Sequence, residues 1–280
     1  MEVESDMAKK TTLSLGTMKE NGEKITMITA YDYSSASLVQ KAGIDTILVG
    51  DSLQMVMLGD TSTIAATTDV MIHHTKAVIA GAPDTFVVTD MPFGSCSSPE
   101  TAIAHATRMM KEARCDAVKI EGGVSMAPVI KAVVDAGIPV VGHIGLTPQT
   151  TSKLGGFKVQ GKGEAAGEVL ADALAVQEAG AFMVVLECVP AELSTLITQR
   201  LSIPTIGIGA GNGTDGQVLV YHDMLGLFDK FLPKFVKQYR QIGEEIVGGV
   251  KEYISDVKSA AFPEEKHSFG GVTREDLKDL

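Results

Sequence analysis

The chain has 280 residues, of which 45% are hydrophobic and 5% aromatic, and it carries a formal net charge of −11. Its Lys and Arg residues form no basic stripe, so nucleic acid is excluded as an expected partner. No apolar run reaches the roughly 18 residues of a membrane span and the polar start lacks a signal peptide, so we expect no membrane contact. Three cysteines without metal spacing indicate free thiols and a cytoplasmic location.

Eight short runs rich in Ile and Val predict strands, and amphipathic segments between them predict helices. The runs are apolar at consecutive positions, as is typical of parallel strands buried on both faces. This alternation favours an α/β fold, a single-domain (β/α)8 TIM barrel, over an open doubly wound sheet. The predicted strands are residues 25–30, 46–50, 86–90, 117–121, 139–144, 182–187, 204–209 and, more weakly, 224–228. The predicted helices are residues 34–43, 67–81, 99–113, 125–137, 164–180 and 190–201.

The remaining segments are predicted to lie around this alternation. Residues 1–10 form an N-terminal extension, residues 11–258 the barrel catalytic domain, and residues 259–280 a polar C-terminal tail. A terminal helix is predicted within 230–258. Residues 147–163 are rich in Gly, Thr and Lys, and we expect them to form a loop that closes over the active site.

Acidic side chains stand at the ends of four predicted strands. Asp51, Asp90, Glu121 and Glu187 end or follow their strands, and Lys119 lies two residues before Glu121. Because barrel strands all point one way, these ends meet at one rim. Neighbouring carboxylates repel one another unless a cation lies among them. A site with only oxygen ligands and with room for water favours Mg²⁺ over Zn²⁺. One such carboxylate alone is more simply a helix cap or a solvated group, an interpretation that weakens when four strands share the feature.

A histidine and a glycine-rich segment are further candidates. His143 in VVGHIG follows a predicted strand, which makes it a candidate proton donor or substrate partner, although a lone histidine is as often structural. The segment GIGAGNGTDG (207–216) lacks the Lys and helix start of a phosphate loop, so we expect its glycines to permit close backbone approach to a ligand. We interpret His73, His74 and His105, inside predicted helices, as surface or packing residues.

The motifs together resemble the ketopantoate hydroxymethyltransferase (3-methyl-2-oxobutanoate hydroxymethyltransferase) family over nearly the whole chain. In order they are TAYDYSSA, VGDS, TDMPFGS, VKIEGG, GHIGLTPQ, LECVP and IGIGAG. The resemblance implies a (β/α)8 barrel that forms a homo-oligomer, commonly a decamer, and acts in pantothenate and coenzyme A biosynthesis. It implies transfer of a hydroxymethyl group from 5,10-methylenetetrahydrofolate to 3-methyl-2-oxobutanoate, giving 2-dehydropantoate (ketopantoate), with Mg²⁺ required.

The resemblance also implies roles for the residues at the rim. Asp51 and Asp90 would bind Mg²⁺ directly, and Glu121 directly or through water. Asp51, Ser52, Asp90 and Lys119 would bind the 2-oxoacid. These residue types suit the chemistry, because a chelated Mg²⁺ stabilises the enolate and Lys119 supplies a positive charge for the substrate carboxylate.

Glu187 would be the proton acceptor, taking the C3 proton so that the enolate attacks the one-carbon unit. His143 lies in a family motif and would line the substrate pocket. One departure is Gln54 in VGDSLQMVMLGD, where glycine is expected in many family members. This departure concerns the shape of the loop and not the chemistry.

Two other functions remain open at this point. One is a magnesium-dependent barrel enzyme of the phosphoenolpyruvate mutase and isocitrate lyase kind, which has the same fold and a similar use of the metal. A catalytic cysteine in a loop would favour this function. Cys96 sits among serines without an activating basic neighbour. A non-catalytic scaffold with a solvated acidic rim predicts no magnesium-dependent ligand binding.

Overall fold

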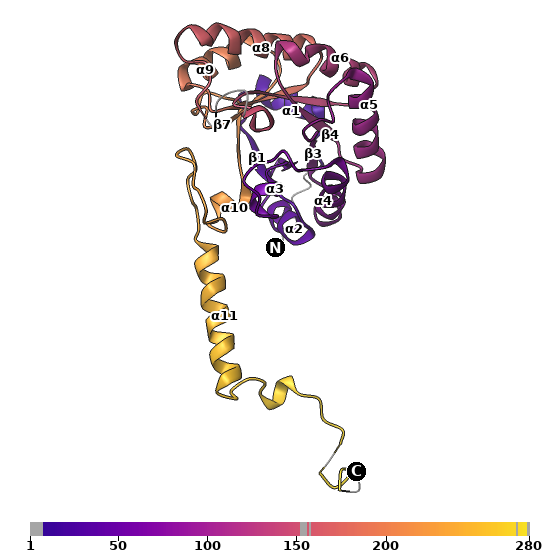
Figure 1. Cartoon of the computed structure of the whole chain (residues 1–280), viewed down its shortest axis with the longest axis vertical. Helices are drawn as coiled ribbons and strands as arrows, with labels where there is room; N and C mark the ends of the chain where they lie inside the picture. The colour runs from indigo at the N-terminus through magenta and orange to yellow at the C-terminus, as the bar shows by residue number, and fades with distance from the viewer. Residues whose placement is uncertain (1–7, 152–155, 157, 273, 279–280) are drawn as a thin grey trace.

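The protein forms a closed barrel of eight parallel strands in the order β1 to β8, in a computed structural model that describes residues 8–151, 156, 158–272 and 274–278 (Figure 1). The predicted TIM barrel is confirmed, and an open sheet is excluded. The strands are β1 (Ile25–Thr29), β2 (Thr46–Val49), β3 (Phe86–Asp90), β4 (Ala117–Glu121), β5 (Val140–Gly145), β6 (Met183–Glu187), β7 (Thr205–Ile208) and β8 (Gly216–Leu219).

Helices follow the first six strands, as predicted, and cover the outside of the barrel (Figure 1). Polar side chains start three of them: the side chains of Asp32, Thr67 and Ser98 each accept a hydrogen bond from a backbone N–H three residues on. The predicted helix 99–113 is divided, because its last five residues form a π-helical turn. These helices are α2 (Tyr33–Lys41), α3 (Leu53–Val56), α4 (Thr68–Gly81), α5 (Pro99–Arg108), α6 (Ala127–Asp135), α8 (Ala166–Glu178) and α9 (Ala191–Arg200).

A further helix, α1 (Thr12–Glu20), precedes the barrel and was not predicted. Its side chains Leu15 and Met18 are buried in the same cluster as the apolar residues inside the barrel, among them Ile25 and Phe86. Ile25 and Phe86 are the first residues of their strands, so α1 closes the N-terminal end of the barrel. The opposite rim, where the strands end, is left for a binding site.

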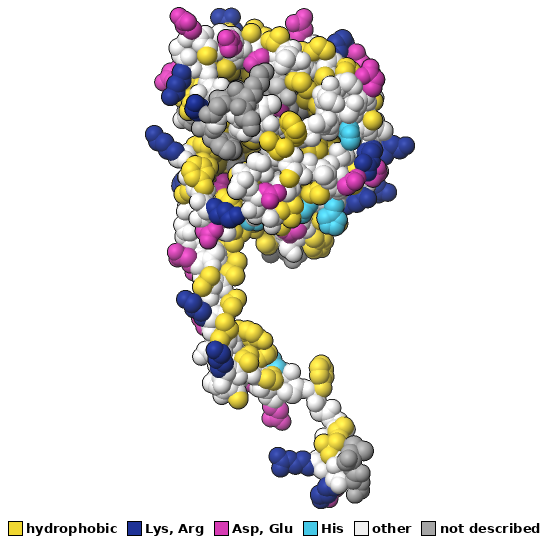
Figure 2. Space-filling view, in the orientation of Figure 1, with side chains coloured by type: hydrophobic (Ala, Val, Ile, Leu, Met, Phe, Trp, Pro, Cys, Tyr) yellow, Lys and Arg dark blue, Asp and Glu magenta, His cyan; other side chains and the backbone are white. Residues whose placement is uncertain are grey.

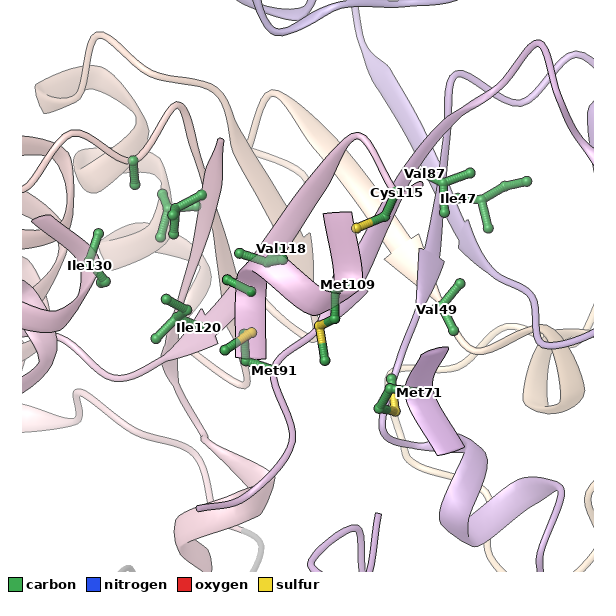
Figure 3. Close-up of a cluster of buried hydrophobic side chains, with 14 of the residues drawn as sticks. Ile47, Val49, Met71, Val87, Met91, Met109, Cys115, Val118, Ile120 and Ile130 are labelled. Carbon is green, nitrogen blue, oxygen red and sulfur yellow. The ribbon is translucent and has the colours of Figure 1, made fainter. Parts of the chain in front are cut away.

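The strands are apolar at consecutive positions because they face two cores. One set of side chains points into the barrel, for example Leu48 and Val88. The alternate set, including Ile47 and Val87, packs outward against helices (Figure 3). The outward cluster also contains helical and loop residues, labelled in Figure 3 as Met71, Met91, Met109 and Ile130.

The prediction of the eighth strand at 224–228 is wrong. β8 instead pairs with β1 and β7 through Gly216, which lies opposite both Ile25 and Ile206. Its sequence GQVL contains a glycine and an exposed Gln217, so it lacks the continuous apolar run that marks a buried strand. The short helix α10 (Tyr221–Met224) and a loop occupy the predicted range.

The C-terminal helix α11 (Ile242–Lys258) projects away from the barrel (Figure 1) and has no buried residue. It begins twelve residues later than the segment 230–258 in which a terminal helix was predicted. Hydrophobic side chains are visible along it (Figure 2). Within the described residues, no helix is both long enough and apolar enough to cross a membrane. The predicted bounds of the extension, the domain and the tail stay predictions, and residues 1–7 lie outside the described residues.

Candidate active site

The four acidic side chains predicted to share a rim line one cavity of about 380 Å³. Asp90, Glu121 and Glu187 are the last residues of β3, β4 and β6, and Asp51 lies two residues beyond β2. Asp51 and Asp90 are only 4% and 2% exposed. The geometry therefore brings together the residues predicted from the strand ends.

Lys119 lies among three of these carboxylates. It pairs with Asp90 in the register of β4 against β3, and its Nζ lies 3.0 Å from Asp90 Oδ1. Burial alone lowers the pKa of Lys119, but the charges of Asp90, Glu121 and Asp51 outweigh it and hold the pKa above its usual range. Lys119 is therefore a permanent buried cation that a substrate carboxylate can share.

The charge of Asp51 is unfavourable in the metal-free cluster. Burial and the charges of Asp90 and Glu121 raise its pKa to about 8, against the smaller opposing effects of Lys119 and Gln149. Its backbone N–H donates to Asp90 Oδ2 at 2.9 Å. A cation beside Asp51 would stabilise its charged form and so oppose the effects of burial and of the neighbouring carboxylates.

Ser52 stands at the N-cap position of α3, but its hydroxyl does not cap the helix. That hydroxyl instead lies 2.8 Å from the Tyr31 hydroxyl. Both Ser52 and Asp51 line the cavity. Asp51 and Ser52 are therefore part of the cavity wall, and the Ser52 hydroxyl is not used at the helix end.

Gln149 belongs to the site and was not singled out from the sequence. Its Nε2 donates to Asp51 Oδ2 at 2.8 Å and to the Met91 carbonyl at 2.9 Å. Its backbone N–H donates to Glu121 Oε2 at 3.1 Å. The available signal was its place in GHIGLTPQ, four residues after β5, but its neutral side chain drew no attention beside the acids.

His143 lies inside β5 and not beyond it, with its ring 3% exposed. Nδ1 is 3.1 Å from Lys119 Nζ and 3.3 Å from Glu121 Oε1, and Nε2 is 3.1 Å from Glu187 Oε2. Burial and the Lys119 charge lower the pKa of His143, but Glu121 and Glu187 outweigh them and raise it to about 9. In the charged ring both nitrogens carry a hydrogen. In the neutral ring Nδ1 accepts a hydrogen bond from Lys119, so the hydrogen is on Nε2. His143 therefore presents an N–H toward Glu187.

The backbone around Glu187 is held closely. Gly145, opposite Glu187 in the sheet, has φ +87°, and a Cβ there would lie 2.3 Å from the Glu187 carbonyl oxygen. The next residue, Cys188, is one of few described non-glycine residues with positive φ, at +50°. Such backbone conformations persist where the surrounding structure fixes them, often at functional sites.

The carboxylate cluster fits a hard cation that keeps part of its water shell. Asp90 Oδ1 and Glu121 Oε1 are buried and accept no well-aligned hydrogen bond from the described residues, although Lys119 Nζ and His143 Nδ1 lie 3.0 Å and 3.3 Å from them. With Asp51 they offer only oxygen ligands. Across the described part of the chain, no group of three His, Cys, Asp or Glu side chains is arranged so that it could hold a metal ion by itself. Mg²⁺ is commonly held by one or two carboxylates plus water and substrate oxygens, so this donor set suits Mg²⁺.

The outer part of the cavity has a different character. Aromatic and aliphatic side chains that follow β8 line it, namely Val220, Phe228, Phe231, Pro233 and Phe235. Backbone hydrogen bonds tie this segment back to α10 and the residue after it, from Tyr239 N–H to the Met224 carbonyl and from Ile242 N–H to the Leu225 carbonyl, each at 2.9 Å. The cavity therefore offers a polar inner wall and an apolar outer wall.

Comparison with known sequences decides between the open interpretations. The sequence profile described as ketopantoate hydroxymethyltransferase matches residues 9–265. The chain belongs to the ketopantoate hydroxymethyltransferase family. The 3-methyl-2-oxobutanoate hydroxymethyltransferase of Heliobacterium modesticaldum is 59% identical over 267 residues, covering 94% of this chain and 97% of that protein. The enzyme of the same name from Moorella thermoacetica is 57% identical over 257 residues, covering 91% and 96%.

Solved structures similar to this family member share its fold. A 2,3-dimethylmalate lyase of the PEP mutase/isocitrate lyase superfamily has a TM-score of 0.60 and 17% identity, covering 96% of this chain and 90% of the lyase. A phosphonopyruvate hydrolase in complex with oxalate and Mg²⁺ has a TM-score of 0.61 and 12% identity, covering 96% and 94%. At these identities the likeness concerns the barrel and not the chemistry.

The glycines of 207–216 have a use other than the one predicted, since protein side chains fill the space beside three of them. A Cβ on Gly209 would lie 2.7 Å from the ring of Phe235, and one on Gly211 would lie 2.5 Å from the Cβ of Ala191. A Cβ on Gly213 would meet Thr195 in the same way. The expected backbone approach to a ligand is therefore wrong for these glycines, although Gly209 shapes the site through Phe235.

The loop predicted to close over the site falls partly outside the described residues, which omit 152–155 and 157. On either side of these, Pro148, Lys158 and Val159 line the cavity. The predicted closure stays a prediction.

The other residues weighed from the sequence have structural explanations. Gln54 is buried and its side chain donates to Asp60, whose N–H donates back to the Gln54 carbonyl at 3.0 Å. His74 Nδ1 lies 2.6 Å from the Tyr31 carbonyl, and His105 Nδ1 lies 2.8 Å from the Thr68 hydroxyl. Gln54 therefore stabilises its own turn, and both histidines are packing residues.

Proposed function

We propose that this chain transfers a hydroxymethyl group from 5,10-methylenetetrahydrofolate to 3-methyl-2-oxobutanoate, giving 2-dehydropantoate, with Mg²⁺ as cofactor. The names of its relatives supply the oxoacid and the reaction. The observation that carries the proposal is a single cavity in which Glu187, His143 and Lys119 adjoin three further carboxylates. Deprotonation beside a carbonyl needs a base, an electrophile and a carboxylate clamp together.

The inner wall binds and activates the oxoacid. Lys119 Nζ attracts the substrate carboxylate, and the Ser52 hydroxyl, held by Tyr31, adds a hydrogen bond. Asp51 and Asp90 would hold Mg²⁺, and Glu121 would bind it directly or through water. When bound there, Mg²⁺ supplies Lewis acidity that lowers the energy of the negative charge developing on the keto oxygen.

Glu187 is the base that removes the C3 proton. Its side chain is 16% exposed and its Oε2 lies 3.1 Å from His143 Nε2. The His143 N–H fixes the direction of the Glu187 carboxylate and leaves the other oxygen for the substrate. His143 is thus a positioning residue, and Gly145 and Cys188 hold the backbone on both sides.

A cysteine-dependent lyase reaction is disfavoured by the environment of the thiols. Burial raises the pKa of Cys96 to about 11, and burial likewise raises the pKa of Cys188 to about 11. Both thiols stay protonated near neutral pH and are weak nucleophiles.

The outer wall receives the folate. The inner wall accommodates a small oxoacid, whereas the whole cavity of about 380 Å³ lies in the size range of pockets for larger organic ligands. Phe228 and Phe235 offer faces on which a flat pterin ring can stack. Lys158 and Lys234, also on the lining, carry charges opposite to those of a glutamate tail.

The active form is a cytoplasmic homo-oligomer, for which a decamer is the state that the family resemblance implies. The support is an exposed apolar stripe on α11, on which only Tyr253 has a ring contact, with Phe262, among the described residues. Five apolar side chains, each between 43% and 57% exposed, follow one another at spacings of three, four or one along this helix. They are Ile246, Val250, Tyr253, Ile254 and Val257. Contiguous apolar surface of this kind marks protein interfaces.

The test is proton exchange without folate. The protein is incubated with 3-methyl-2-oxobutanoate in deuterated water, with and without Mg²⁺, and the C3 proton is followed by NMR. Exchange should require Mg²⁺ and fall about 10²–10⁴-fold in Glu187→Gln. The matched control is Glu192→Gln, which changes an exposed acid at the start of α9 and should exchange like the wild type.

Two results would contradict parts of the proposal. Equal exchange in Glu187→Gln would remove Glu187 as the base. Full magnesium affinity in Asp90→Asn, measured by titration calorimetry, would remove Asp90 as a ligand. Absence of magnesium-dependent exchange in the wild type would contradict the reaction itself.

A further inference from the structure

A fifth acidic side chain, Asp223, lines the same cavity and has no role in the function proposed above. It lies in α10, just after β8, and is 7% exposed. Within the described residues its carboxylate has no hydrogen bond or ion pair, while its backbone carbonyl accepts from Gln238 Nε2 at 3.3 Å. The carboxylate oxygens are not fully enclosed by protein atoms, so a carboxylate without a protein donor on the cavity lining is available to a ligand.

Asp223 stands across the barrel from Lys119, which is proposed to bind the substrate carboxylate. β8 closes the barrel between β7 and β1, four strands from β4, which carries Lys119 and Glu121. Val220, Phe228 and Phe235, from the same segment after β8, also line the cavity. Asp223 therefore belongs to the apolar outer wall, where we place the folate.

Among the described residues, none of the charged and titratable groups around Asp223 forms an ion pair that would hold its carboxylate in one protonation state. Tyr31 faces it from the end of β1, with its own pKa raised by burial and only slightly by Asp223. His222 stands beside it in α10 with a pKa lowered by burial, and Lys158 and Lys234 lie on the same cavity without an ion pair to it. Burial raises the pKa of Asp223 itself to about 6, close to the range in which acid–base catalysts work best.

We propose that Asp223 is a second acid–base catalyst of this site, acting on the one-carbon donor and not on the oxoacid. The inference rests on the proposed function, because it takes methylenetetrahydrofolate as the donor. It adds a catalytic residue on the outer wall, so that each substrate has its own proton-transfer group.

Protonated Asp223 donates its proton to N10 of the donor as the bond between N10 and the methylene carbon breaks, and N10 keeps the bonding electrons. Water then adds its oxygen to the methylene carbon, which remains on N5, and its proton returns to Asp223. Release of the carbon as formaldehyde moves the hydroxyl proton to N5 and frees tetrahydrofolate. The enolate formed by Glu187 adds to formaldehyde, and the proton held by Glu187 completes the product hydroxyl group. Atoms and charges balance, with one water consumed.

The test separates the two substrates in Asp223→Asn, which keeps the size of the side chain. Exchange of the oxoacid C3 proton without folate should stay within about twofold of wild type. Turnover with methylenetetrahydrofolate should fall about 10²–10⁴-fold. Turnover with formaldehyde in place of the folate donor should stay within about twofold, because the N10 bond no longer has to be broken.

The matched control is Asp229→Asn, an exposed acid on the segment that follows α10 and not on the cavity lining. It should leave all three rates unchanged. Asp223→Ser serves as a second variant, and thermal unfolding of each variant shows whether it is folded. In the wild type, the rate with folate should also depend on a group titrating near pH 6, and this dependence should vanish in Asp223→Asn.

Each outcome decides between the proposals. Full folate-dependent turnover in folded Asp223→Asn or Asp223→Ser would overturn the inference and leave the proposed function intact. An equal fall of all three rates would show a structural role and would also overturn it. A wild type that neither exchanges the C3 proton nor uses the folate donor would overturn both the proposed function and the inference.

Discussion

The two walls of the cavity are built in different ways. The inner wall consists of side chains on β3, β4, β5 and β6, fixed by the register of the barrel, together with Asp51 and Ser52 just after β2. The outer wall consists of apolar side chains on the segment after β8, held by a few backbone hydrogen bonds. Precise geometry is thus placed where proton transfer is proposed, and adaptable apolar surface where a large co-substrate is proposed to bind.

The difference is also one of energy. The inner wall combines Asp51, Asp90 and Glu121 with Lys119, and removal of one charge leaves the others buried without compensation. The outer wall loses only contact area when a ring is truncated. We therefore expect changes in the inner wall to affect both stability and catalysis, and changes in the outer wall to affect the co-substrate alone.

The largest effect is expected from Lys119→Met. This change removes the buried cation 3.0 Å from Asp90, and the free energy of unfolding without metal should fall by about 3–5 kcal/mol. Denaturant unfolding in the presence of a chelator measures it. The control is Lys131→Met in α6, whose pair with Asp135 is exposed and should cost about 0.5 kcal/mol or less. Equal losses in the two variants would contradict a special role for the inner cluster.

Gln149→Leu should have the next largest effect, because Gln149 ties the inner wall to the rim. The variant loses the side-chain donor 2.8 Å from Asp51 and 2.9 Å from the Met91 carbonyl, and leaving these acceptors buried should cost about 1–3 kcal/mol of unfolding free energy. The pKa of Asp51 should rise further, because Gln149 is one of the groups that lower it. A loss of stability that is the same at pH 5 and pH 8 would contradict this coupling.

The particular residues show which parts of the molecule were predictable from sequence. Asp51, Asp90, Glu121 and Glu187 could be assigned to one rim because a parallel barrel converts sequence position at a strand end into spatial position. β8 could not be located, since its sequence GQVL has only two apolar residues and its pairing is fixed by β1 and β7. Local pattern carries no information on such tertiary closure.

The missed site residues have a common cause. Gln149 is neutral, and Asp223 follows the one strand that was misplaced, so neither could be recognised as a strand-end residue. The glycines of 207–216 were read as ligand contacts because the sequence does not reveal that Phe235 fills the space beside Gly209. For Gln149, Asp223 and these glycines alike, the position in the site depends on contacts between segments that are distant in the sequence.

A smaller effect, confined to the outer wall, is expected from Phe235→Ala. The apparent affinity for the folate donor should fall about tenfold, or about 1.4 kcal/mol, while magnesium-dependent exchange of the oxoacid should not change. Gly209→Ala should act in the same direction, because its Cβ would lie 2.7 Å from the Phe235 ring. Phe269→Ala, in the fully exposed tail, is the control. Exchange that falls together with the folate affinity would show that the two walls are not separable.

The smallest effect concerns the pH dependence of stability in the metal-free protein. The pKa of Asp51 is raised from 3.8 to about 8 on folding, so the folded state binds a proton more tightly than the unfolded state. The resulting stabilisation is complete below about pH 4 and is lost as the pH rises through 8. The raised pKa values of Asp90 and His143 act in the same direction, whereas the lowered pKa of Glu121 opposes it.

The melting temperature with chelator should therefore fall by a few degrees between pH 6 and pH 8.5, on the scale of about 2–4 °C per kcal/mol for a domain of this size. Mg²⁺ competes with the proton for the same carboxylates, so it should raise the melting temperature more at pH 8.5 than at pH 6. Asp51→Asn should flatten both dependences. A larger stabilisation by Mg²⁺ at the lower pH would mean that the ion binds away from the inner wall, and the contrast between the two walls would lose its electrostatic basis.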